Sequence, residues 1–164
     1  MDNQLVAVSV AKIYGWLNII LIEVPLPDRP PVFMRMDNPC SSNAQLVVVD
    51  AMKFWELWRR CINPIEHPIA NANPQIWLHD KKIHLAEDGF SRGRDNPVPL
   101  ANVAFQNGYV TVSDITRTIW LLAHGCKAFP VECDLPGEAM LQQLAGVPYT
   151  DNSTATTTSN HTNK

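Results

Sequence analysis

The segment Ser113–Thr118 places one carboxylate, one guanidinium and three hydroxyl groups close together in the chain. It follows a β-branched run at residues 109–112 and precedes an apolar run that ends in His-Gly. This pattern predicts a strand that passes directly into a helix over residues 115–124. The first backbone N–H groups of a helix lack partners within the helix, and the helix dipole is positive there. The segment can therefore bind an anion, above all a phosphate group.

Each polar side chain of this corner, residues 113–118, has one role at a phosphate site and another in a capped helix. Ser113 or Asp114 can cap the helix. Thr116 and Thr118 can donate hydroxyl hydrogen bonds to a phosphate, and Arg117 can pair with that phosphate or with Asp114. Spacing alone leaves two interpretations open: a phosphate site, and a capped helix with one salt bridge.

The elements that position the corner follow from apolar periodicity and turn residues. Aromatic residues at i, i+1 and i+4 of one predicted helix, Phe54, Trp55 and Trp58, belong to the core. In chain order we predict two strands within residues 4–24 that turn near Gly15, a loop over 25–43, a strand over 46–50, a helix over 51–61 capped by Asp50, a hairpin over 75–86 that turns at Asp80-Lys81, a helical turn over 100–105, a strand over 109–112, the helix 115–124, a strand over 128–134 and a helix over 136–146.

A wider window, VAFQNGYVTVSDITRTIWLLAHGCKAFPVEC, resembles the core of the ParB/sulfiredoxin-like superfamily. In that core a strand leads into a polar box, often Asp/Asn-Gly-Arg-His-Arg, and then into a helix, a glycine and a strand with Pro-Val. Residues 110–114 resemble the strand, and Arg117 and Thr118 resemble the end of the box. Together with LVVVDAMKFWELWRR upstream, the chain is similar to the plasmid fertility inhibition factors of the Osa/FiwA group.

The resemblance implies an α/β (α+β) fold, a ParB/sulfiredoxin-like mixed sheet with about three helices. It implies a fertility inhibition factor that blocks conjugative type IV secretion of DNA, with ATPase and DNase activity. ATP and Mg²⁺ would be its cofactors, and DNA or nucleotide phosphate and a conjugative coupling or secretion protein its partners. In this reading Asp114 orients a water or a metal, Arg117 contacts phosphate, and the protein docks at the inner face of the inner membrane.

The chain departs from the superfamily box at its centre, where Ile115 and Thr116 replace the glycine, the first arginine and the histidine. A missing cation weakens charge neutralisation at a transferring phosphoryl group, so hydrolysis is less expected than binding. Arg92 and Arg94 would replace this cation if their loop folded over the corner. The alternative is a degenerate, non-catalytic adaptor that binds a secretion or partition protein. A ParB-type DNA-binding module is a weaker third reading.

Composition limits the number of domains and the class of protein. The chain has 164 residues, 46% of them hydrophobic and 18% charged, which suits one domain over residues 1–149 and a disordered polar tail over 150–164. A net charge of −3 argues against a dedicated DNA-binding domain. No secretory signal or membrane span is predicted. The four cysteines form no Cys-x-x-Cys pair, which predicts reduced thiols in a cytoplasmic protein.

Three other groups of residues could do chemistry, but the sequence favours a structural role for each. His79 and His84 on the predicted hairpin lack the further ligands that a structural zinc site needs, so we expect exposed histidines. Glu87 and Asp88 could hold a divalent cation, but they suit a turn after a strand better. Cys126 lies at the negative end of a predicted helix, which raises the pKa of a thiol, so we expect Cys126 to be unreactive. No metal site is therefore predicted.

Overall fold

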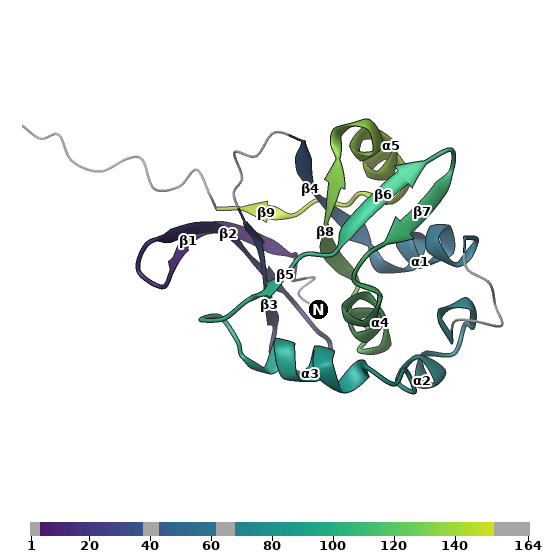
Figure 1. The fold of residues 1–164 in the computed structure, drawn as a ribbon, viewed down its shortest axis with the longest axis horizontal. Coiled ribbons are helices and arrows are strands. Elements are labelled where there is room, and N and C mark those ends of the chain that lie inside the picture. Colours follow the sequence, from purple (N-terminus) through teal and green to yellow (C-terminus); the bar gives the residue numbers. More distant parts are fainter. Residues whose placement is uncertain (1–3, 38–42, 62–67, 153–164) are drawn as a thin grey trace, which may run out of the picture.

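The computed structural model describes residues 4–37, 43–61 and 68–152, which form two mixed sheets and the helices that flank them (Figure 1). The first sheet contains, in spatial order, β5 (Val98–Pro99), β3 (Val32–Asp37), β2 (Leu17–Val24), β1 (Ala7–Ile13) and β9 (Thr150–Asp151). The second sheet contains β4 (Ala44–Asp50), β8 (Ala128–Asp134), β6 (Asn102–Gln106) and β7 (Tyr109–Val112). The helices are α1 (Ala51–Arg59), the 3₁₀ turn η1 (Pro68–Ala70), α2 (Pro74–Trp77), α3 (Ile83–Ser91), α4 (Ile115–Ala123) and α5 (Leu135–Ala145).

The predicted mixed α+β fold is confirmed, and the three predicted helices correspond to α1, α4 and α5. Local chemistry explains where they begin. The Asp50 carboxylate accepts a hydrogen bond of 2.9 Å from the backbone N–H of Lys53, which caps α1 as the sequence predicts. The Asp134 carboxylate caps α5 in the same way, with Pro136 in its first turn.

The β1–β2 hairpin is also confirmed. Its turn holds Tyr14 at φ 56° and Gly15 at φ 76°, so two consecutive residues adopt the left-handed conformation that reverses the chain. Glycine adopts this conformation without steric cost, whereas Tyr14 carries a side chain there.

Three predicted segments differ in the structure. Residues 32–37, predicted as loop because prolines surround them, form β3 between β2 and β5. Residues 100–105, predicted as a helical turn, contain most of β6, which pairs with β7 and β8. In both cases pairing with neighbouring strands supplies backbone hydrogen bonds that a short sequence window does not reveal.

The third difference is that residues 75–86, predicted as a hairpin, form no hairpin but parts of α2 and α3 and the turn between them. Asn73 caps α2 by accepting a hydrogen bond of 3.0 Å from the N–H of Gln75, and Pro74 opens that helix. The Asp80 carboxylate then accepts a hydrogen bond of 2.8 Å from the N–H of Lys82, a turn that leads into α3. Glu87 and Asp88 consequently lie on a helix and not in a turn after a strand.

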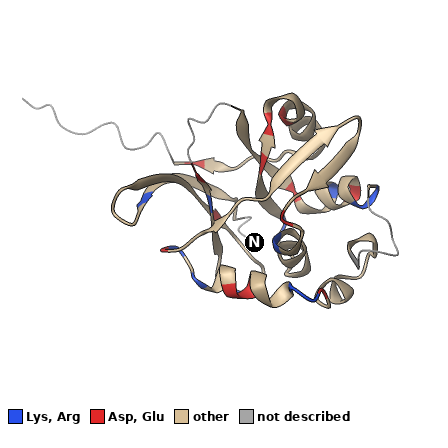
Figure 2. Ribbon diagram, viewed as in Figure 1, with Lys and Arg blue, Asp and Glu red and all other residues tan. Residues whose placement is uncertain are grey.

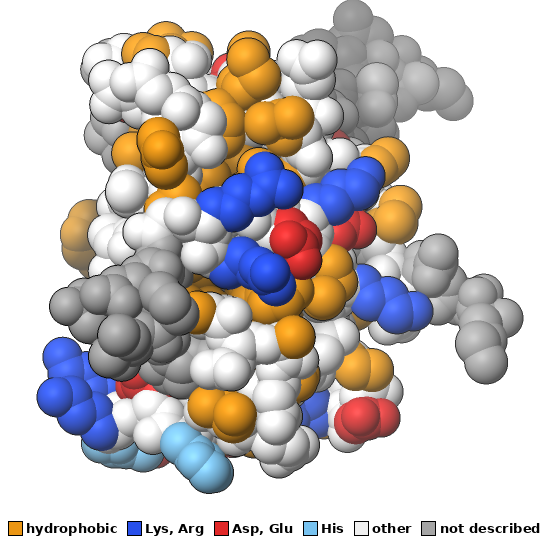
Figure 3. Space-filling view, turned by 90° about the vertical axis from the view of Figure 1, so that its right-hand side faces the viewer, with side chains coloured by type: hydrophobic (Ala, Val, Ile, Leu, Met, Phe, Trp, Pro, Cys, Tyr) orange, Lys and Arg blue, Asp and Glu red, His pale blue; other side chains and the backbone are white. Residues whose placement is uncertain are grey.

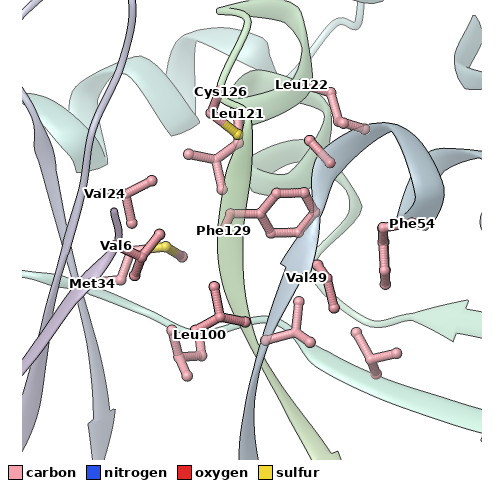
Figure 4. Packing of buried hydrophobic residues seen from close by; sticks show 14 of the residues in the cluster. Val6, Val24, Met34, Val49, Phe54, Leu100, Leu121, Leu122, Cys126 and Phe129 are labelled. Carbon is pink, nitrogen blue, oxygen red and sulfur yellow. The ribbon is translucent and has the colours of Figure 1, made fainter. Parts of the chain in front are cut away.

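Side chains from both sheets and from the helices meet in one core (Figure 4). Met34 of the first sheet, Phe129 of the second and Leu121 of α4 are all buried. Phe54 of α1 meets the edge of Phe129 with ring centroids 5.3 Å apart. The predicted burial of all three α1 aromatic residues is confirmed, since each is at most 4% exposed. This packing fixes α4, and with it the corner, between the two sheets.

Thr150 and Asp151, predicted as part of the polar tail, form β9 and pair in parallel with β1. The paired part of the chain thus extends beyond residue 149. Residues 153–164, the rest of the predicted tail, lie outside the described residues. No helix in the described ranges is long and apolar enough to cross a membrane.

Candidate functional site

The corner predicted from the sequence lies where β7 ends and α4 begins. Asp114 occupies the N-cap position, but its side chain makes no hydrogen bond to the first turn of α4. Its carboxylate instead accepts a hydrogen bond of 3.2 Å from the Ser113 hydroxyl and pairs with Arg117 Nη2 at 3.4 Å. The salt bridge of the structural interpretation is therefore present without its helix cap, and the first N–H groups of α4 carry no side-chain cap.

Arg117 joins α4 to a neighbouring strand as well as to Asp114. Its Nη1 donates a hydrogen bond of 2.9 Å to the carbonyl oxygen of Pro99 in β5. The side chains of Asp114 and Arg117 are about one-third exposed. Arg117 is thus held in place by two partners, and it reaches solvent with only part of its guanidinium.

A hollow of about 500 Å³ opens beside the corner, and we call it the basic hollow. Its floor and one wall come from residues 113–117, and its other wall comes from the connection between α2 and α3 and the first turn of α3. That second wall carries Lys81 and Lys82, both exposed and both without an ion pair among the residues that the structure describes. Figure 2 shows these blue residues below the blue start of α4.

The structure brings only some of the predicted site residues to this hollow. Ser113, Asp114, Thr116 and Arg117 line it. Thr118 does not, because it is 1% exposed and its hydroxyl donates a hydrogen bond of 3.1 Å to the backbone carbonyl oxygen of Asp114.

Arg92 and Arg94 lie away from the basic hollow. Arg92 is the C-cap of α3, at the opposite end of the helix from the corner, and the Arg94 guanidinium lies 5.7 Å from the Phe33 ring centroid. The cations that face the corner are Lys81 and Lys82. These lysines were not predicted as site residues, because the sequence pattern placed Lys81 at the tip of a hairpin. The Asn-Pro pair at residues 73–74 was the signal for a helix instead.

A second hollow, of about 480 Å³, lies on the other side of Ser113, and we call it the sheet hollow. Ends of all four strands of the second sheet surround it. Glu132 of β8 lines it, and the pKa of this carboxyl is raised by partial burial and by the Asp37 carboxylate. Ser113 is the residue that lines both hollows.

The other chemical candidates have structural roles. His79 and His84 are exposed, as predicted, and the described ranges contain no cluster of three metal-ligating side chains. Glu87 accepts hydrogen bonds from Trp120 and Arg29. Burial raises the pKa of the Cys126 thiol, which makes it unreactive.

The thiols at positions 61, 126 and 133 are free among the described residues. Cys40 and His67 lie outside the described residues.

Charge on another face is mixed. Figure 3 shows the side over α1, where Lys and Arg side chains gather around acidic ones. There Arg59 pairs with Glu56 at 3.7 Å, and its guanidinium lies 4.7 Å from the centroid of the Trp55 ring. Because Arg59 already has these partners, this face is a weaker candidate for phosphate than the basic hollow.

Comparisons with known proteins agree on one family. The family described as plasmid fertility inhibition factor matches residues 46–146, more than half of the chain. Protein osa of Shigella flexneri is 32% identical over 136 residues, which covers 79% of this chain and 70% of that protein. A crystal structure of Oncogenic Suppression Activity Protein, a plasmid fertility inhibition factor solved as a gold(I) cyanide derivative, matches with a TM-score of 0.70 at 29% identity, over 87% of this chain and 76% of that one. The chain belongs to the plasmid fertility inhibition factor family.

Proposed function

We propose that this protein blocks the delivery of DNA to a conjugative type IV secretion system and that it binds nucleotide or DNA phosphate in the basic hollow. Its membership of the fertility inhibition family supports the first part. The observation that carries the second part is the pair Lys81 and Lys82 facing the N-terminal turn of α4 across that hollow.

The chemistry of the basic hollow suits a phosphate. The donors are the ammonium groups of Lys81 and Lys82, which have no ion-pair partner among the described residues, the uncapped N–H groups of α4 and the Thr116 hydroxyl. The positive end of the helix dipole adds to their field. Leu85, which is 57% exposed, and Ile115 supply apolar surface beside them. The volume lies within the range of about 300–1,000 Å³ that is common for small-molecule sites.

Magnesium would accompany a bound nucleotide rather than occupy a site made by protein alone. Asp80 and Asp114 are the carboxylates of the basic hollow, and each already accepts a hydrogen bond. One or two carboxylates together with phosphate oxygens and water are a usual magnesium environment, so these residues fit the ion. When bound, Mg²⁺ would neutralise phosphate charge.

Binding is better supported than hydrolysis. Arg117 is hydrogen-bonded to Pro99 and paired with Asp114, so neither member of that pair is free to activate a water or to follow a transferring phosphoryl group. The lysines restore positive charge to the corner, but exposed and flexible ammonium groups are not a preorganised site. Any ATPase or DNase activity would be weak.

A second candidate function is a non-catalytic adaptor, and one observation favours it. Tyr14 and Trp16 at the tip of the β1–β2 hairpin are 66% and 73% exposed. Exposed aromatic side chains are enriched at the centres of protein interfaces. This tip can dock on a secretion or partition protein without using the corner.

One set of variants tests both functions. The double variant Lys81→Gln/Lys82→Gln should bind ATP and a short DNA duplex at least about tenfold more weakly than the wild type, because charge-assisted contacts are lost. Lys12→Gln/Lys53→Gln removes two exposed charges elsewhere, on β1 and α1, and is the matched control. The same proteins are produced in donor cells with a mobilisable plasmid, and the transfer frequency is measured.

The combination of binding and transfer results distinguishes the two functions. If binding and inhibition of transfer both fall in the double variant, the basic hollow carries the function. If binding falls but inhibition persists, the adaptor function is correct. A wild type that binds neither ligand refutes the phosphate site, and a wild type that leaves transfer unchanged refutes the block of conjugation.

A further inference from the structure

The two hollows share Ser113 as a lining residue, and their chemistry differs. The Ser113 hydroxyl oxygen accepts a hydrogen bond of 3.1 Å from the backbone N–H of Asn102 and donates to Asp114. The Ser113 N–H donates to the Asn102 carbonyl oxygen at 2.9 Å. Hydrogen bonds therefore hold Ser113 in place, and it lines both the basic hollow, which carries the lysines, and the sheet hollow.

The sheet hollow offers hydrogen-bond acceptors and little positive charge. Asn102, Thr111 and Glu132 are adjacent on one face of the sheet, because Asn102 pairs with Glu132 and Ala104 pairs with Thr111. Within the described residues the Glu132 carboxylate has no hydrogen-bond donor and no ion-pair partner, and the Asp37 carboxylate repels it. A partly buried carboxylate without a donor costs free energy, which a ligand with N–H or O–H groups would recover.

We propose that the sheet hollow receives the nucleoside end of a nucleotide whose phosphates occupy the basic hollow, with Glu132 accepting a hydrogen bond from an amino or hydroxyl group of that nucleoside. This inference rests on the proposed phosphate site. A nucleotide is the ligand class that joins an anionic end to a neutral end rich in donors, and the two adjoining hollows match those ends. Each hollow has a volume suited to a small molecule.

Substitution of Glu132 distinguishes a hydrogen bond to the nucleoside from a general charge effect. Glu132→Gln removes a negative charge, so simple charge effects would strengthen the binding of every anion. Loss of a hydrogen bond from the nucleoside to the Glu132 carboxylate instead weakens only the binding of nucleotides and not that of other anions. The two effects have opposite signs.

The experiment measures the affinity of the full chain for ATP, 2′-deoxy-ATP and inorganic tripolyphosphate by calorimetry, with and without Mg²⁺. For Glu132→Gln we expect ATP affinity to fall about tenfold and tripolyphosphate affinity to stay level or rise. Glu23→Gln on β2 is the matched control and should change neither affinity. Thr111→Val, which removes a hydroxyl from the same hollow, should weaken ATP binding less, and it replaces Glu132→Gln if that variant fails to fold.

The results separate this inference from the proposed function. If Glu132→Gln weakens ATP but not 2′-deoxy-ATP, the donor is the ribose 2′-hydroxyl; if it weakens both, the donor lies elsewhere on the nucleoside. Equal changes for ATP and tripolyphosphate overturn the inference and leave the phosphate site standing. A loss seen only with Mg²⁺ also overturns it, because Glu132 would then hold the metal. If the wild type binds neither ATP nor tripolyphosphate, the proposed phosphate site itself fails.

Discussion

Glu87 connects three parts of the fold, and removing its carboxylate should destabilise the protein measurably. Glu87 Oε2 accepts a hydrogen bond of 2.7 Å from Trp120 Nε1, and Oε1 accepts one of 3.1 Å from Arg29. Trp120 is 1% exposed and stacks on Phe90 with ring centroids 4.5 Å apart. The Arg29 guanidinium lies 5.3 Å from the Trp120 ring centroid. Glu87 thus fastens α3 to α4 and to the segment between β2 and β3.

The size of the effect comes mainly from the indole. In Glu87→Ala the buried Trp120 N–H loses its acceptor, which costs about 1–3 kcal/mol. The Arg29–Glu87 pair adds little, since its side chains are 37% and 51% exposed and exposed pairs contribute about 0–1 kcal/mol. We therefore expect the free energy of unfolding to fall by about 2 kcal/mol, and the melting temperature to fall by about 4–8 °C.

Urea unfolding at pH 7 measures this change. Glu87→Gln keeps an acceptor oxygen for the indole, so it should lose less than half as much stability as Glu87→Ala. Asp88→Asn on the same helix is the control and should change the unfolding free energy by no more than about 0.5 kcal/mol. If Glu87→Ala is as stable as the wild type, or if Glu87→Gln is equally damaging, the hydrogen bond to Trp120 does not carry the effect.

Three further predictions concern the effect of pH, Arg117 and the C-terminal segment. Burial would raise the pKa of Glu87, but the Trp120 and Arg29 hydrogen bonds lower it overall, while burial and Arg29 lower the pKa of His124. Both folded-state values lie below the unfolded ones, so urea midpoints should fall as the pH drops below about 6.5 and again below about 4.5; a flat pH profile contradicts this. Arg117→Ala loses its bonds to Pro99 and Asp114, so its unfolding free energy should fall by about 1–2 kcal/mol while circular dichroism shows a retained fold; unchanged stability would leave phosphate contact as its role. A chain ending after residue 152 should melt like the wild type, because residues 153–164 have little apolar surface to bury, whereas one ending after residue 149 loses β9 and should melt several degrees lower.

Local sequence signals predict those parts of the fold whose conformation depends on neighbouring residues in the chain. Asp50 before an apolar helix, and the run from β7 through α4 to β8, have the residues that their conformations need, and the structure confirms them. The strand β3 was missed because prolines surround Val32–Asp37 and because part of its pairing comes from β5, which is distant in the sequence and was not predicted. The resemblance to the fertility inhibition factors is confirmed, whereas the ParB/sulfiredoxin-like label stays a prediction.

Only the part of the candidate site made by consecutive residues, 113–117, could be predicted from the sequence. Ser113–Arg117 follow one another, so their meeting required no knowledge of packing. Lys81 and Lys82 reach the corner because α3 packs against α4, and Glu132 reaches Ser113 because β8 runs parallel to β6. Contacts of this kind depend on tertiary structure.

The pairing of β9 with β1 bears on how the chain folds during its synthesis. The N–H of Thr150 donates to the carbonyl oxygen of Val6 at 2.9 Å, which joins nearly the two ends of the described chain. The β1–β2–β3 meander can form soon after its residues leave the ribosome, but its outer edge beside β1 stays open until residues 150–151 have also been made. During that interval an exposed strand edge is available to other chains, so molecules in which β9 has not yet paired with β1 are more prone to pair wrongly.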